Sequence, residues 1–252
     1  MTVIYFNRIR HWRSVLLIGH LLIGCILGLL VFHRYGIRSA VPVAAIGAIL
    51  PDLIDKPLGH ILLKGTLDSG RIYAHTLLFL GIVLVAGILY WRSRSSSLLL
   101  VLGGGIMTHL VLDGMWNIPN TLFWPALGGF LPHSYPDYFG NAFITEVTAP
   151  LEWLAGLSVV MIALEVFGDS TNGLSERFLS SATKLRRPLY VLLAFGGAAT
   201  IVGALLATPM DLMDQESELL TGSSLLVGGI LLIHRDVVSD PSIDRTKAGN
   251  QG

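Results

Sequence analysis

The chain has 252 residues, of which 52% are hydrophobic and 13% are charged, and its formal net charge at pH 7 is zero. Soluble domains carry roughly 25% charged residues, so this composition indicates a polytopic membrane protein. The balanced charge gives no reason to expect nucleic acid as a partner, and the single cysteine, Cys25, excludes an intrachain disulfide or a cysteine-based zinc site.

The N-terminal part of the chain predicts two membrane spans. Residues 1–14 form a short basic arm, and Val15–Phe32 is an apolar run that only His20 interrupts. This run is long enough to cross a bilayer and long for the apolar part of a signal peptide, so we expect a retained helix. A second, short and weaker span, Ile37–Ile54, ends in Leu50-Pro51-Asp52-Leu53-Ile54-Asp55.

Five further apolar segments follow along the chain. They are His75–Trp91, Ser97–Leu112, Pro150–Phe167, Leu189–Thr208 and Leu219–Ile233. Residues 117–148 contain no Lys or Arg and are predicted to form a long loop, while the polar residues 235–252 are predicted to be disordered. The sequence therefore predicts an all-α fold, a polytopic transmembrane bundle of about seven spans, without a soluble domain.

Alternation of the spans brings several polar residues to one end of this bundle. We call the end at which the first span begins the site end. His20 lies near the start of the first span, the second span returns to the site end, the third starts there and the fourth finishes there. The residues collected in this way are His20, Asp52, Asp55, His75, His109 and Asp113.

The pair His109 and Asp113 lies in the stretch GGGIMTHLVLDGMW, residues 103–116, at the end of the fourth span. A spacing of four residues puts both side chains on one helical face, with Cβ atoms ~5–6 Å apart. Ionisable groups are costly inside a membrane and commonly mark functional sites. The pair could share a divalent cation, or it could form a hydrogen bond that locks two helices together.

Asp52 and Asp55 are three residues apart and follow a proline. Two such close carboxylates repel each other unless they are protonated, solvated or bridged by a cation. Alone, the aspartates could simply begin a solvated loop, and His20 or His75 could serve in packing or capping. Together, three imidazoles and three carboxylates suit zinc, with manganese or iron as alternatives, and could hold two ions.

The predicted loop supplies further candidates near the site end. Glu146 and Glu152 flank Pro150 and could provide a general base or a partner for a ligating imidazole. They could equally be solvated carboxylates at a helix N-terminus. His133 and Asp137 belong to the same group of candidates.

The order of these motifs resembles that of the LexA-regulated, membrane-bound, prophage-encoded metal-dependent hydrolase family. Members carry a leading His, an LLPDIDHP-like motif, an HRGxTHS-like motif, an SHxxxD helix and a following WP. The matching positions here are His20, Leu50-Pro51-Asp52 with Asp55, Arg71 with His75-Thr76, His109 with Asp113, and Trp124-Pro125. The resemblance covers about residues 15–130 and implies that they form a helical core around a metal site, with residues 131–234 adding an outer loop and more helices.

The chain departs from the family pattern at several positions. Two residues separate Asp52 from Asp55 where the family has one, Lys56 replaces the histidine after the second aspartate, and Gly70 replaces the histidine that opens the second motif. The resemblance implies hydrolysis through metal-bound water, with Asp52 or Asp55 accepting the proton. A site near a membrane surface suggests a lipid-linked ester or phosphoester as substrate.

A competing hypothesis is a non-catalytic membrane protein, either a metal or ion transporter or a scaffold, because intramembrane His/Asp clusters also mark ion pathways. The collection of ligands at one end, and the lack of a visible repeat, speak against a transporter. The sequence gives no indication of the oligomeric state.

The distribution of positive charge predicts the orientation of the bundle. Of the 17 Lys and Arg residues, six lie at the site end, namely Arg8, Arg10, Arg13, Lys56, Lys64 and Arg71, and the other eleven lie at the opposite end. Because cytoplasmic loops are enriched in Lys and Arg, we expect a multi-pass protein of the cell membrane whose site faces the extracytoplasmic side. The three arginines of the N-terminal arm argue for the reverse orientation.

Overall fold

The computed structural model describes residues 17–132, 137–167, 176–206 and 212–238, and these contain helices but no strand. The main helices are α1 (Leu17–Tyr35), α2 (Ala40–Pro57), α3 (Leu77–Arg94), α4 (Leu98–Leu112), α6 (Tyr138–Thr148), α7 (Pro150–Phe167), α8 (Glu176–Leu206) and α9 (Leu212–Val238). Short elements between them are the π-helical turn η1 (Leu58–Leu62), the 3₁₀ turn η2 (Met115–Asn117) and α5 (Pro119–Leu122). The predicted arm, residues 1–14, lies outside the described residues.

A helix covers most of the described residues of each predicted span, and the prediction of an all-α polytopic bundle is confirmed. Five helices, α1, α3, α7, α8 and α9, contain apolar stretches long enough to cross a membrane. The helix α4 is apolar but has only 15 residues. The helix α2 has 18 residues but ends with Asp52, Asp55 and Lys56, as expected for the weaker second span.

Several boundaries differ from the prediction. The segment predicted as a loop, residues 117–148, contains α5 and the eleven-residue helix α6, whose N-cap Asp137 accepts a hydrogen bond from Gly140 N. The helix α8 starts thirteen residues before the predicted apolar segment and includes Pro188. Its first half is polar, so the apolar pattern did not predict that part of the helix. The helix α9 continues to Val238, so the first four residues of the predicted tail are helical; residues 239–252 lie outside the described residues.

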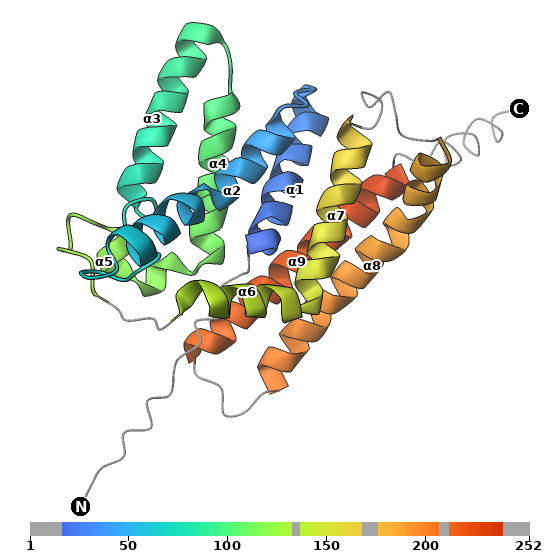
Figure 1. Ribbon diagram of the computed structural model, residues 1–252. Coiled ribbons are helices and arrows are strands. Elements are labelled where there is room, and N and C mark those ends of the chain that lie inside the picture. Colours follow the sequence, from blue (N-terminus) through green and yellow to red (C-terminus); the bar gives the residue numbers. More distant parts are fainter. Residues whose placement is uncertain (1–16, 133–136, 168–175, 207–211, 239–252) are drawn as a thin grey trace, which may run out of the picture.

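The helices form a bundle in which α2 lies between α1 and α4 (Figure 1). The α3–α4 hairpin flanks α2 on one side, and α7, α8 and α9 lie on the other side of α1. The helix α6 runs across the lower end of the bundle, where α1 begins and α2 and α4 end. This lower end is the site end, and the alternation predicted for the first four helices is confirmed.

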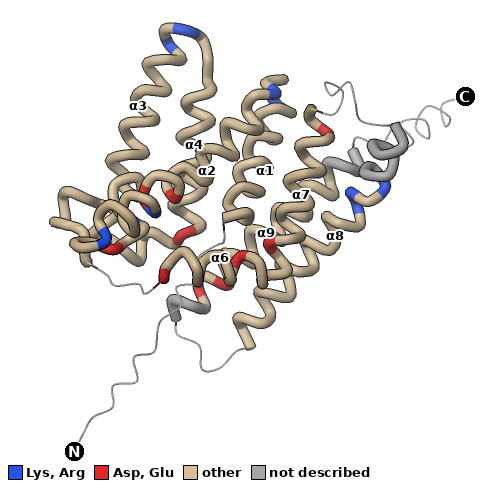
Figure 2. Tube along the Cα trace, viewed as in Figure 1, with Lys and Arg blue, Asp and Glu red and all other residues tan. Residues whose placement is uncertain are grey.

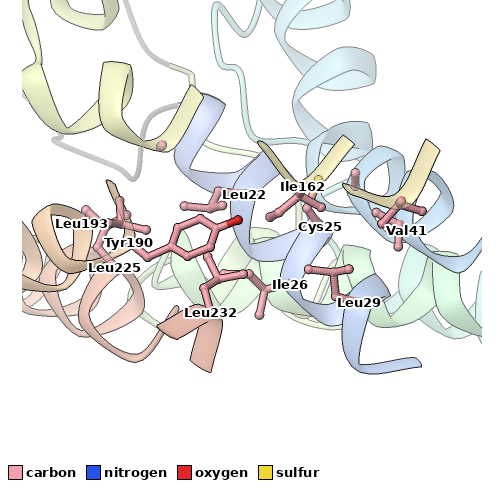
Figure 3. Close-up of a cluster of buried hydrophobic side chains, with 13 residues drawn as sticks. Leu22, Cys25, Ile26, Leu29, Val41, Ile162, Tyr190, Leu193, Leu225 and Leu232 are labelled. Atoms are coloured by element: carbon pink, nitrogen blue, oxygen red, sulfur yellow. The ribbon is translucent and has the colours of Figure 1, made fainter. Parts of the chain in front are cut away.

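The hydrophobic core is centred on α1. Leu22, Cys25 and Ile26 of α1 pack against Ile162 of α7, Leu193 of α8 and Leu225 of α9 (Figure 3). The largest fully buried side chain, Tyr190 of α8, belongs to the same cluster. This packing fixes α1, and with it the first turn that carries His20.

Close approach of α2 to both of its neighbours depends on glycines. A Cβ atom on Gly28 of α1 would lie 2.4 Å from Val41 Cα, and one on Gly105 of α4 would lie 2.4 Å from Ala44 O. Real side chains are not found this close to backbone atoms, so only glycine permits these helix spacings. The resulting contact of α2 with α4 positions Asp52 and His109 relative to each other.

Candidate metal centre

Four of the predicted ligands meet at the site end. Their ligand atoms all lie within 4.8 Å of one another, and the residues are Asp52, His75, His109 and Asp113. Asp52 lies in the last two turns of α2, His75 immediately precedes the N-cap Thr76 of α3, His109 lies in the last turn of α4 and Asp113 caps that helix. Both imidazoles are fully buried.

Five distances among the four ligand atoms lie between 3.1 and 3.8 Å. His75 Nε2 lies 3.1 Å from His109 Nε2 and 3.6 Å from both Asp52 Oδ1 and Asp113 Oδ2. His109 Nε2 lies 3.8 Å from the same two oxygens. Donors on a tetrahedron with metal bonds of about 2.0–2.2 Å are separated by roughly 3.3–3.6 Å, which is close to most of these distances, so the four residues could hold one metal ion.

Hydrogen bonds behind the imidazoles determine which nitrogen faces the centre. His109 Nδ1 lies 2.7 Å from the carbonyl oxygen of Ala48, and His75 Nδ1 lies 2.7 Å from Asp55 Oδ2. Because a carbonyl or carboxylate oxygen accepts, each Nδ1 carries the proton and donates it. Each ring therefore presents its Nε2 to the other at 3.1 Å, and two neutral rings would present lone pairs there that can bind a cation.

Asp55 lies outside the group of four ligand atoms. Its carboxylate accepts hydrogen bonds from the backbone N–H groups of Ile72, Ala74 and His75, in addition to His75 Nδ1–H. The residue is completely buried. This arrangement ties the segment before α3 to the end of α2 and sets the orientation of the His75 ring.

His20 contacts the centre from α1 without joining the group of four. Its Nε2 lies 3.2 Å from Asp113 Oδ1, and its ring packs on that of His109 with a centroid separation of 4.3 Å. Asp113 therefore directs Oδ2 toward the other ligand atoms and Oδ1 toward His20. His20 is placed to hold this carboxylate in position.

Glu146 and Glu152 lie at the N-terminus of α1. Glu152 Oε2 accepts from the N–H groups of Ile18 and Gly19, and Glu146 accepts from those of Leu17 and Ile18. The first N–H groups of a helix have no partner within the helix, and carboxylates near them are favourable. Both glutamates therefore contact the first residues of the helix that carries His20. Neither belongs to the group of four ligands.

Two cationic side chains contact the ligand carboxylates. Lys56 Nζ lies 2.6 Å from Asp52 Oδ2, and Arg71 Nε donates to Asp113 Oδ2 at 2.8 Å. Arg71 was expected from the resemblance. The contact of Lys56 was not predicted, although its spacing of four residues from Asp52 on a helix indicates one.

A second buried pair was not predicted from the sequence. His60 Nδ1 of η1 lies 2.9 Å from Asp68 Oδ1, and the His60 ring stacks on Tyr138 of α6 at 3.7 Å. Burial lowers the pKa of His60 below its ordinary value, against the opposing effect of Asp68. Residues eight positions apart do not contact each other along one helix or strand, so the sequence did not predict this pair. The turn formed by η1 and the residues after it brings the two side chains together.

Two of the remaining candidates make contacts other than with the four ligands. Trp124 stacks with Phe130 and contacts Tyr73 edge to face, so it belongs to an aromatic cluster. Asp137 caps α6, and His133 lies outside the described residues. 

Comparison with known proteins identifies one family. A family model described as YdjM inner membrane protein matches residues 15–203. No curated protein and no solved structure matches the chain. The matched segment includes all four ligand residues, the cations Lys56 and Arg71, and most of the helical bundle.

Proposed function

The chain belongs to the YdjM inner membrane protein family, and from this premise we propose that it is a metal-dependent hydrolase of that membrane. The substrate we propose is a lipid-linked ester or phosphoester. This choice is supported by the position of the four ligands, which lie at the end of a bundle whose helices are long and apolar enough to cross a bilayer.

The observation that carries the proposal is the convergence of the two imidazoles. Each Nδ1–H is engaged by an oxygen behind the ring, and the Nε2 atoms face each other at 3.1 Å with a carboxylate oxygen of Asp52 and of Asp113 nearby. When both rings are neutral, their Nε2 lone pairs and the two carboxylate oxygens would supply four ligand atoms to one divalent cation. Zinc suits two nitrogen and two oxygen donors at these separations, and manganese or iron could also bind.

When bound, a divalent ion supplies Lewis acidity and lowers the pKa of water. The chain itself would contribute positioning and a proton acceptor. Asp55 and the Ala48 carbonyl hold the imidazoles in register, and His20 and Arg71 hold Asp113. We assign proton acceptance to Asp52 Oδ2, which faces Lys56 while Oδ1 faces the imidazoles. Asp55 is the weaker candidate because its oxygens already accept four N–H groups.

One observation favours a second candidate, a non-catalytic centre that stabilises the bundle or passes ions. Structural zinc sites use four protein ligands, whereas catalytic sites usually keep a position open. Here four protein residues could supply all the ligands of one ion, and both histidines are fully buried. Such a centre would bind metal without hydrolysing any ester.

We propose further that the site end faces the periplasm. Figure 2 shows Lys and Arg at the turns between α1 and α2 and between α3 and α4, while carboxylates predominate at the site end. The positive-inside tendency then places those turns in the cytoplasm. Substrates confined to the cytosol would not reach a centre with this orientation.

The test uses purified full-length protein in neutral detergent, compared with the variants His109→Ala and His33→Ala. His33 is an exposed histidine at the far end of α1 and serves as the matched control. Metal content and hydrolysis of 4-nitrophenyl esters and phosphodiesters are measured on the same samples. We expect stoichiometric metal and chelator-sensitive hydrolysis in wild type and His33→Ala, and loss of both in His109→Ala.

Two results would overturn the hydrolase. Wild type without stoichiometric metal would remove the metal centre altogether. Stoichiometric metal whose removal unfolds the protein, combined with no hydrolysis of either substrate class, would establish the structural centre instead.

A further inference from the structure

We propose that Lys56 and Arg71 form an anion-binding subsite beside the metal centre, and that this subsite selects a lipid phosphodiester over a neutral carboxylic ester. The inference rests on the metal-dependent hydrolase proposed above and names its substrate class. It depends on three observations: the contacts of the two cations, the charge balance of the centre, and the apolar residues around it.

Lys56 lies next to the ligands and also reaches the surface. Its Nζ contacts Asp52 Oδ2 at 2.6 Å, whereas Asp52 Oδ1 faces the imidazoles. The exposed fraction of the side chain is 29% for Lys56 and 5% for Asp52. An ammonium group carries three donors, so a substrate oxygen arriving from the surface can share Lys56 with Asp52.

Arg71 flanks the other ligand carboxylate. Its Nε donates to Asp113 Oδ2 at 2.8 Å, and its side chain is 18% exposed. Burial raises the pKa of the Tyr138 phenol of α6, and the positive charges of Lys56 and Arg71 oppose this shift, so both cations lie near the same phenol. Guanidinium and ammonium groups at a water-poor site are the usual partners of phosphate oxygens.

The charges around the centre favour an anion. Three carboxylates contact or support the ligand set, namely those of Asp52, Asp55 and Asp113. Lys56, Arg71 and one of the two charges of a divalent ion balance them, which leaves one positive charge. A phosphodiester carries one negative charge, whereas a carboxylic ester carries none and would leave this charge uncompensated in a site of low dielectric constant.

Exposed apolar side chains near the subsite favour a lipid over a soluble phosphodiester. Ile61 and Leu62 of η1 are 63% and 75% exposed, and Phe143 of α6 is 69% exposed. Stacking of His60 on Tyr138 joins these two elements at the edge of the subsite. Exposed apolar residues on a helix that crosses the end of a membrane bundle insert at the level of the lipid head groups, where lipid phosphates lie.

The experiment measures binding by isothermal titration calorimetry to zinc-loaded, full-length protein in neutral detergent. Three probes separate charge from lipid character. Dihexyl phosphate has one negative charge and two apolar chains, dimethyl phosphate has the charge without the chains, and trihexyl phosphate has chains without the charge. Wild type is compared with Lys56→Met, Lys56→Arg, Arg71→Gln and the control Lys64→Met, which removes an exposed lysine from the same end of the molecule.

We expect wild type to bind dihexyl phosphate at least ~10-fold more tightly than either other probe. Loss of one charge-assisted hydrogen bond should weaken this binding roughly 10-fold or more in Lys56→Met and Arg71→Gln. Lys56→Arg, which keeps the charge, should stay within about 3-fold of wild type, and Lys64→Met should equal wild type.

Zinc content, measured on every sample, separates failure of this inference from failure of the hydrolase. Zinc-replete Lys56→Met that binds dihexyl phosphate as wild type does would overturn the subsite and leave the metal centre intact. Equal losses in Lys56→Met and Lys56→Arg would show that side-chain shape, not charge, is recognised, and would also overturn it. Tight binding of trihexyl phosphate would refute the claim that the subsite selects a negative charge. Tight binding of dimethyl phosphate would refute the claim that it selects a lipid over a soluble phosphodiester.

Discussion

Replacing Gly105 with alanine should weaken metal binding without touching any ligand. The new Cβ atom would lie 2.4 Å from Ala44 O and 2.8 Å from Ala48 N, both backbone atoms of α2 that cannot rotate away. Ordinary contact requires the helices to separate by about 1 Å. The same movement would lengthen the hydrogen bond from His109 Nδ1 to Ala48 O, now 2.7 Å, beyond its normal range.

Two magnitudes follow from this displacement. Loss of a hydrogen bond that orients a metal-binding imidazole typically costs 10–100-fold in metal affinity, and overpacking typically costs 1–3 kcal/mol of folding stability. Zinc affinity is measured by chelator competition in detergent, and stability is measured by thermal unfolding. Gly104→Ala is the matched control, because its Cβ would meet only the flexible end of Leu27 at 3.3 Å. Gly105→Ala with the zinc affinity of Gly104→Ala would refute the claim that α2–α4 packing sets the centre.

Three further predictions concern the surroundings of the centre. Asp55→Asn should lower zinc affinity about 10–100-fold, because the amide cannot accept all four N–H groups; unchanged affinity in chelator competition would exclude its orienting role. Glu152→Gln should lower thermal stability by about 1 kcal/mol through the weakened cap on α1, with hydrolysis within about 3-fold of wild type; a 100-fold loss of hydrolysis would instead identify a general base. In a Cys25→Ser background, a membrane-impermeant maleimide should label Thr66→Cys and not Ser93→Cys in cells whose outer membrane is permeabilised, and the reverse pattern would place the centre in the cytoplasm.

Much of the fold follows from the sequence because a membrane span requires a minimum length of apolar residues. That requirement located seven helices, and counting their alternation brought His20, Asp52, Asp55, His75, His109 and Asp113 to one end. The helix α6 escaped prediction because its residues, with Gly140 and Asn141 among aromatics, have the composition of a loop. It lies across the end of the bundle (Figure 1), so no spanning length was required of it.

Individual contacts at the centre could not be predicted from residue type alone. Asp52 and Asp55 are equally plausible ligands by spacing, and the distinction between them comes from the N–H groups of Ile72 and Ala74, which turn toward Asp55. The pairing of His60 with Asp68 depends on the π-helical turn that follows α2. Such loop geometry has no periodic pattern in the sequence.

X-ray absorption spectroscopy of the zinc-loaded protein tests the central claim most directly, since it reports the donors around the ion. The four residues Asp52, His75, His109 and Asp113 predict about four nitrogen or oxygen donors at roughly 2.0–2.1 Å, with scattering from two imidazole rings. The spectrum of His109→Ala should show scattering from only one imidazole ring, or this variant should retain no zinc. The spectrum of His33→Ala should match that of wild type. A wild-type spectrum without imidazole scattering, or a protein that retains no stoichiometric zinc, would contradict the metal centre.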